Sequence, residues 1–238
     1  MKTRFLWIAL LLVVALLLAG CSPRLRVGEL QSESQSVELA DAESVRVEIE
    51  FGAGDLQVTG GAAKLLEADF TYNVARLKPE VKYTDGRLTV RQPEARGLPA
   101  LQGITDFRNE WDLRFSNQVP IDLRLEMGAG SSDLQLAGLS LTRLNLSLGA
   151  GESTIDLSGN WARDLDVAID AGAANITVRL PRDVGVRVEV YAGLSTINAP
   201  SLTKDGNVYT NAAYGVSDVT LRINIKAGIG QLYLEVAE

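Results

Sequence analysis

The chain of 238 residues contains no histidine and only one cysteine, and each scarcity removes a class of chemistry. Without histidine there can be no Ser-His-Asp or Cys-His mechanism, and the commonest zinc ligand is missing. Because Cys21 is the only cysteine, no disulfide can form within the chain. The sequence therefore predicts no catalytic residue, no metal site and no cofactor, and it predicts a protein that is not an enzyme.

Basic residues are also in short supply, with 23 Lys and Arg against 30 Asp and Glu. A folded body of this charge lacks the clustered Lys and Arg that nucleic acids or an anionic lipid surface would require. The sequence therefore excludes nucleic acid as a partner. Any attachment to a membrane must come from another part of the chain.

The first 20 residues supply such an attachment. Lys2 and Arg4 precede an apolar run of 15 residues, 5–19, which is shorter than the roughly 20 residues that a membrane-spanning helix needs. The tetrapeptide Leu18-Ala19-Gly20-Cys21 resembles the bacterial lipoprotein signal. We expect cleavage between Gly20 and Cys21, lipid on Cys21, and an extracytoplasmic protein anchored to the cell membrane or the outer membrane.

An Ala-Gly pair returns six times in the rest of the chain, with the glycine at Gly54, Gly130, Gly151, Gly172, Gly193 and Gly228. Apolar residues stand seven, five and three positions before every one of these glycines, which is the alternation of a half-buried strand. The three columns are Val47, Leu123, Leu144, Leu165, Val186 and Leu221; Ile49, Leu125, Leu146, Val167, Val188 and Ile223; Phe51, Met127, Leu148, Ile169, Val190 and Ile225.

A second alternating segment follows each glycine, and no helical periodicity is found beyond the signal region. Repeats that cannot bury an apolar face alone are expected to stack. The sequence predicts an all-β fold, a parallel β-solenoid of about six coils with an inserted β-hairpin region. We expect the alanine of each pair to point inward, and the glycine to form the corner with a positive φ.

Composition divides the chain into a signal peptide (1–20), a polar flexible tether (21–42) and one β-solenoid domain (43–238). Insertions interrupt the repeat at about 60–120 and 200–217. In the first, residues 65–73, 80–84, 87–91 and 110–117 alternate like strands. Asp85-Gly86 is a typical two-residue hairpin turn between two of them.

Several segments resemble known bacterial families. Residues 65–73, 78–81, 88–93 and 109–113, together with Gly128-Ala129-Gly130, resemble the toast-rack N-terminal domain. Residues 180–188 resemble the C-terminal domain of LiaF-like, cell-wall-active-antibiotic response proteins. The resemblance implies a β-solenoid outside the cytoplasmic membrane and a link to envelope stress, although a lipid anchor here replaces the usual membrane-spanning helices.

Two groups of side chains are candidates for a functional surface. Phe107, Trp111 and Phe115 could form a sugar-stacking or protein-binding surface, or they could be the insertion's own core. Acidic residues of the repeat could act as the paired carboxylates of a glycan-cleaving enzyme, or they could be an ordinary solvated face: Asp156, Asp164, Asp166 and Asp170.

The sequence favours a non-enzymatic, lipid-anchored module that binds or scaffolds an envelope protein or glycan. One alternative is an accessory modulator of an envelope-stress response. A second is a carbohydrate-active β-helix enzyme.

Overall fold

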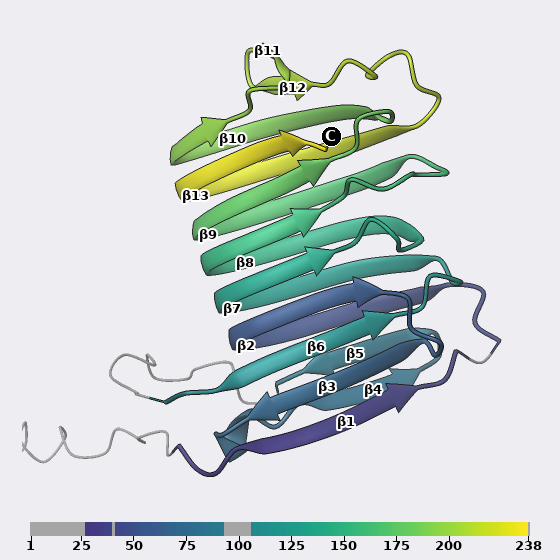
Figure 1. Cartoon of the computed structure of the whole chain (residues 1–238), viewed down its shortest axis with the longest axis vertical. Helices are drawn as coiled ribbons and strands as arrows, with labels where there is room; N and C mark the ends of the chain where they lie inside the picture. Colours follow the sequence, from purple (N-terminus) through teal and green to yellow (C-terminus); the bar gives the residue numbers. More distant parts are fainter. Residues whose placement is uncertain (1–26, 40, 93–105, 238) are drawn as a thin grey trace, which may run out of the picture.

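The computed structural model describes residues 27–39, 41–92 and 106–237, and this part of the chain consists of strands joined by turns and loops (Figure 1). Its helical content there is one 3-10 turn, Ala75–Leu77, and no described helix has the length and apolar character to cross a membrane. The strands are β1 (Gln31–Val37), β2 (Val45–Gly60), β3 (Leu66–Tyr72), β4 (Glu80–Thr84), β5 (Arg87–Arg91), β6 (Asn109–Phe115), β7 (Ile121–Gln135), β8 (Leu141–Asp156), β9 (Leu165–Leu180), β10 (Gly185–Asn198), β11 (Thr203–Asp205), β12 (Val208–Thr210) and β13 (Thr220–Val236).

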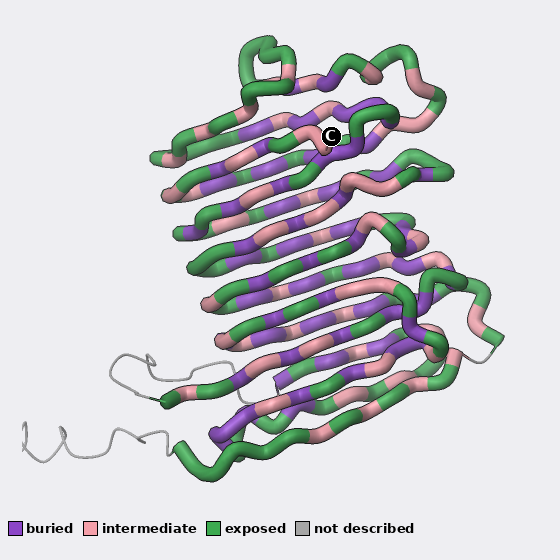
Figure 2. Tube along the Cα trace, in the orientation of Figure 1, coloured by how far each residue is buried: buried purple, intermediate pink, exposed green. Residues whose placement is uncertain are grey.

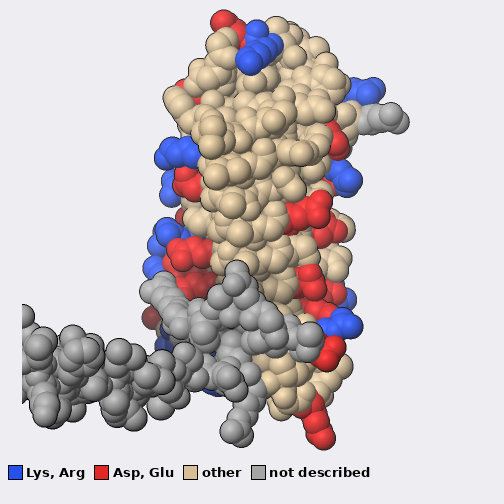
Figure 3. Space-filling view, turned by 90° about the vertical axis from the view of Figure 1, so that its left-hand side faces the viewer, with Lys and Arg blue, Asp and Glu red and all other residues tan. Residues whose placement is uncertain are grey.

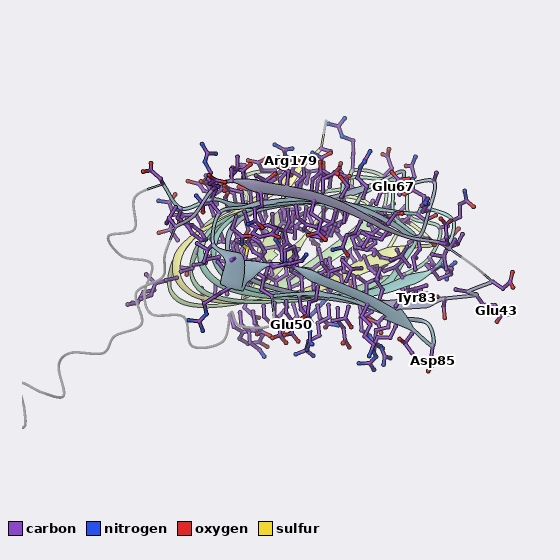
Figure 4. All side chains as sticks on the ribbon, turned by 90° about the horizontal axis from the view of Figure 1, so that it is seen from below. Glu43, Glu50, Glu67, Tyr83, Asp85 and Arg179 are labelled. Carbon is purple, nitrogen blue, oxygen red and sulfur yellow. The ribbon has the colours of Figure 1, made fainter. Side chains whose placement is uncertain are left out.

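The six long strands, β2, β7, β8, β9, β10 and β13, bend in the middle and run through two facing layers (Figures 1 and 4). We call the layer of their first halves the first layer, which β5 and β12 extend at its two ends. The layer of their second halves is the second layer, which β6, β3 and β1 extend. Seen from below, Glu50 and Asp85 lie on the outside of the first layer, and Glu67 and Arg179 on the outside of the second (Figure 4).

The prediction of an all-β fold is confirmed, but the sheet is not wholly parallel. Neighbouring long strands pair in parallel, whereas β1 with β3, β3 with β6, β4 with β5, β10 with β12 and β11 with β12 are antiparallel. The full order is β1-β3-β6-β2-β7-β8-β9-β13-β10-β12-β11. The β4–β5 and β11–β12 pairs are hairpins, whose short connections allow antiparallel pairing.

The core lies between the two layers and is made by the predicted apolar columns. Every residue of the three columns is buried, and purple segments alternate with lighter ones along each long strand (Figure 2). Each buried aliphatic side chain of this kind contributes about 1.5–3 kcal/mol relative to an exposed one. Together these side chains form one continuous apolar cluster that extends from β1 and β3 to β10.

The predicted chemistry of the bends holds only in part. Gly54, Gly130 and Gly151 have the expected positive φ, of 127°, 121° and 129°. Gly172, Gly193 and Gly228 do not; in β13 the positive φ falls on Gly230 instead. The prediction that the alanine points inward is also wrong for half of the copies, because Ala129, Ala150 and Ala192 are exposed. The bend is an outer edge of the molecule, where a methyl group meets solvent.

The stack departs from the repeat in register and in order. Ala150-Gly151 of β8 stands opposite Ala173-Ala174 of β9, two residues beyond the predicted Ala171-Gly172. β13, the last strand in the chain, lies between β9 and β10, where its Ala227 is opposite both Ala171 and Ala192. The C-terminal strand is therefore an internal strand of the sheet.

The predicted tether is wrong for Gln31–Val37, which is strand β1 and pairs with β3 along its whole length. Gly20 and Cys21 lie outside the described residues. In the first insertion the predicted strands are found, β4 and β5 with the same bounds, and Asp85 and Gly86 turn between them with positive φ. The second insertion contains the β11–β12 hairpin, which extends the first layer beyond β10.

Candidate functional site

A groove of about 600 Å³ crosses the outer face of the second layer. Two rows of side chains, in register across neighbouring strands, form its floor. One row runs Thr71, Glu110, Asp55, Ser131, Glu152 across β3, β6, β2, β7 and β8. The other runs Asp69, Asp112, Gln57, Asp133, Thr154 across the same strands. Because adjacent strands are about 4.8 Å apart, neighbours within a row can be touched by one ligand.

The groove is strongly acidic. Six of its lining residues are carboxylates, and none of the described lining residues is Lys or Arg. Ion pairs reach two of the six from outside: Arg108 binds Glu110 at 2.7 Å, and Arg114 lies 3.6 Å from Asp69. The Glu110 carboxylate, by its hydrogen bond, raises the pKa of Arg108. The other four have no ion-pair partner in the described part of the chain: Asp55, Asp112, Asp133 and Glu152.

Hydrogen bonds leave one oxygen at the floor unsatisfied. Asp55 accepts a hydrogen bond from the Ser131 hydroxyl, and Asp133 accepts one from the Gln135 amide at 3.1 Å. Asp112 stands opposite Asp69 in the antiparallel β3–β6 pair, an arrangement of like charges that is unfavourable. The Oδ1 atom of Asp112 is buried and has no hydrogen-bond partner among the described residues.

The carboxylates are spread along the rows instead of meeting at one point. Among the described residues, no group of three His, Cys, Asp or Glu side chains could hold a metal ion. The geometry is therefore that of an extended acidic surface.

The aromatic surface predicted at Phe107, Trp111 and Phe115 is not there. Trp111 and Phe115 are 2% and 1% exposed, while Phe107 is half-buried. The Trp111 ring packs edge-on against Phe51 and Phe70, with centroids 5.0 and 5.2 Å away. Strand alternation of β6 directs Trp111 and Phe115 into the core, so the predicted alternative, a core role, is the correct one for these two rings.

The four carboxylates considered for glycan cleavage are engaged elsewhere. Asp164 and Asp166 each lie 2.9 Å from the Arg222 guanidinium, and Asp170 lies 3.6 Å from Lys226 Nζ. The backbone N–H of Thr220 and then Arg222 lower the pKa of Asp164, the opposite of what a general acid requires. Asp156 accepts a hydrogen bond from the Ser158 N–H at 2.9 Å.

The predicted corner glycines do not line the groove. Its acidic residues are outward-facing members of strands that the sequence did predict. Their signal was present, because Asp55, Asp133 and Glu152 alternate with buried residues after the corner glycine. What could not be inferred was that β6 and β3 would bring Glu110, Asp112 and Asp69 beside them.

The family model of the N-terminal domain of toast_rack, DUF2154, matches residues 26–179. The chain belongs to this family. The toast-rack match covers every strand that lines the groove and ends within β9. It does not reach residues 180–188, for which the LiaF-like resemblance stays a prediction. Among curated proteins, none matches the chain.

A solved structure supports the fold of this toast-rack protein. A candidate cell adhesion protein from Clostridium sporogenes is 31% identical, with a TM-score of 0.84, over 88% of this chain and 100% of that one. A candidate adhesin from Bacteroides fragilis is 10% identical over 87% of this chain and 97% of that one, with a TM-score of 0.34.

Proposed function

We propose that this toast-rack protein is a non-enzymatic binding module of the cell envelope, attached to a membrane by lipid on Cys21. In this proposal the six bent strands act as the coils of a rigid β-solenoid, and the acidic groove is its binding surface. The observation that carries the proposal is the row geometry of the groove, which presents four carboxylates that have no ion-pair partner among the described residues. The likeness to a candidate cell adhesion protein supports a binding role.

The chemistry of the groove favours an envelope protein that presents Lys or Arg side chains. Clustered carboxylates on one face attract such a segment at long range, and the attraction falls as salt is added. Close contact would also give the buried Asp112 Oδ1 a donor. A neutral glycan could use the groove hydroxyls and amides, but it would leave the negative charge unbalanced.

Site-specific photocrosslinking in the native host tests this proposal. A photoreactive residue replaces Thr154 in the groove, and a control replaces Asn145, which lies on the first-layer half of the same strand β8. We expect a discrete adduct from position 154 that weakens with salt and disappears in Asp133→Asn/Glu152→Gln, and no such adduct from position 145. The same adducts from both positions, or adducts that persist in the double variant, would contradict the groove.

Lipid attachment needs its own experiment. Growth with an alkyne-labelled fatty acid should label the wild-type protein and Ser22→Ala, and should leave Cys21→Ser unlabelled. Retention of the label in Cys21→Ser would overturn the anchor without affecting the groove.

A further inference from the structure

Strand β10 leaves part of one edge open. On one side it pairs with β13 from Gly185 to Asn198. On the other side only Arg187–Glu189 pair with β12, and the Val190 N–H donates to the Asn207 carbonyl at 2.9 Å. From Tyr191 to Asn198, this second edge has no strand partner among the described residues. We call these eight residues the open edge.

The open edge lacks the charges that normally protect such an edge. No charged residue occurs between Glu189 and Lys204. At the opposite end of the stack the two edge strands are protected: β1 contains Glu33, and β4 contains Glu80 and Lys82. Natural sheets use such charges to prevent unwanted strand pairing. Because such charges are absent from the open edge, we infer that pairing with another strand is tolerated there.

An exposed apolar patch adjoins the open edge. One position of the bend is alanine in four strands, and it is occupied by Ile229 and Leu194 in the last two. The four alanines are Ala53, Ala129, Ala150 and Ala173. The Ile229 and Leu194 side chains are 58% and 80% exposed, and nearby Tyr191 is 52% exposed. Figure 3 shows this side of the molecule, where charged groups lie along the margins and the middle is largely uncharged.

A second feature points to an absent neighbour. The Ser195 Oγ atom is buried but has no hydrogen-bond partner in the described part of the chain. Ser195 and Ile197 alternate with the exposed Leu194 and Thr196, so they face the core side of the last strand, where Ile197 is only half-buried. A strand added beyond β10 would cover Ile197 and offer Ser195 a partner.

The two layers end at different heights, and this decides what can fill the space. The β11–β12 hairpin continues the first layer by two strands beyond β10, whereas the second layer stops at β10 (Figure 1). If a second copy paired its β10 antiparallel with the open edge about a twofold axis, the first layers of both copies would lie on the same side of the joined second layer. The two hairpins would then occupy the same space. A single extended segment meets no such obstacle.

We propose that the open edge of β10 binds an extended segment of a partner polypeptide as an additional strand of the second layer. The segment is uncharged at its centre and apolar at alternate residues, which face Ile197, and its backbone hydrogen-bonds to the edge. This is strand addition, a mode in which main-chain hydrogen bonds give affinity and alternate side chains give specificity. The proposal is independent of the acidic groove.

A peptide of the chain's own sequence 229–236 provides a probe, because its residues 229–233 already pair with the other edge of β10. We expect saturable binding of the fluorescent peptide to the full chain in detergent micelles, measured by anisotropy. Two further peptides are N-methylated at odd or at even residues. In an extended peptide, the N–H groups of alternate residues point to opposite edges, and only one edge can face β10. Methylation of the N–H groups on that edge should therefore abolish binding, and methylation of the other set should preserve it.

Thr196→Glu should weaken binding several-fold, because it places a charge on an edge that carries none, and charged edge residues oppose strand pairing. Gln231→Glu is the matched control, since Gln231 stands opposite Thr196 on β13, whose two edges are both paired. Absence of saturable binding, equal binding of both methylated peptides, or equal loss in both variants would overturn the proposal. A concentration-dependent dimer that Thr196→Glu dissociates would also overturn it, in favour of a second copy.

Discussion

The Ser132 hydroxyl donates a hydrogen bond to the Ser153 hydroxyl over 2.8 Å, inside the core just past the bends of β7 and β8. The two residues stand opposite each other in the parallel pair and are 6% and 3% exposed. Polar side chains at inward positions of a sheet are tolerated when they satisfy each other. The pair is therefore a unit whose members should not be replaceable one at a time.

Ser132→Ala or Ser153→Ala should each lower the free energy of unfolding by about 1–2 kcal/mol, because each leaves the other hydroxyl buried without its partner. The double variant should lose less than the sum of the two, since it removes both polar groups. Urea unfolding of the four proteins measures this. Ser147→Ala, at an exposed position of β8, is the control and should change stability by less than about 0.5 kcal/mol. Strict additivity of the two losses would contradict the pairing.

Gly130→Ala should be markedly more destabilising than Gly61→Ala. Both glycines have positive φ, 121° and 92°, so both variants pay the backbone cost of about 1–2 kcal/mol. A Cβ on Gly130 would also collide with the Gly54 carbonyl of the neighbouring strand, whereas a Cβ on Gly61 meets nothing within 4 Å. The thermal midpoints of the two variants measure the difference. Equal shifts would mean that close stacking of the bends contributes nothing.

Much of the fold could be predicted because strand alternation has a period of two and the core is apolar throughout. The same period explains the register error between β8 and β9. A shift of two residues leaves every side chain on its original face, so the pattern cannot distinguish Ala171-Gly172 from Ala173-Ala174 as the partner of Ala150-Gly151. The side-chain columns therefore do not record this register.

The remaining differences depend on which strands become neighbours. Val186, Leu221 and Leu165 are equivalent members of one column, so nothing in the sequence ranks β13 before β10. The polar run Gln31–Val37 lacks apolar alternation because its pairing with β3 relies mainly on backbone hydrogen bonds. The groove could not be predicted for the same reason. Asp112 and Asp69 are 43 positions apart in the sequence, and they meet only through the β3–β6 pair.

Asp164→Asn should destabilise the protein at neutral pH but not at low pH. The Thr220 N–H and Arg222 hold the pKa of Asp164 below its ordinary value of 3.8 in the folded state. A carboxylate whose pKa is lower in the folded state stabilises the fold at pH values above its pKa in the unfolded state. This contribution disappears as the pH falls through the pKa of the folded state. The difference in thermal midpoint between wild type and Asp164→Asn should therefore shrink below about pH 3.8.

Asp183→Asn serves as the control for this pH series, because Asp183 is exposed between β9 and β10. Its difference from wild type should not follow the same curve. A deficit in Asp164→Asn that stays constant from pH 7 to pH 3 would show that the charge of Asp164 is not the source of the effect.

Ile225→Ala should loosen two strands that are far apart in the sequence. Ile225 is 0% exposed in β13 and stands opposite Ile169 of β9 and Val190 of β10. The substitution should cost about 2–5 kcal/mol. Since β10 reaches the rest of the stack through β13, hydrogen exchange should accelerate in β10 as well as β13, and remain slow in β2. Ile49→Ala, at an equally buried position of β2, should show the reverse pattern. If β10 kept its protection in Ile225→Ala, the C-terminal strand could not be the one that holds β10 in place.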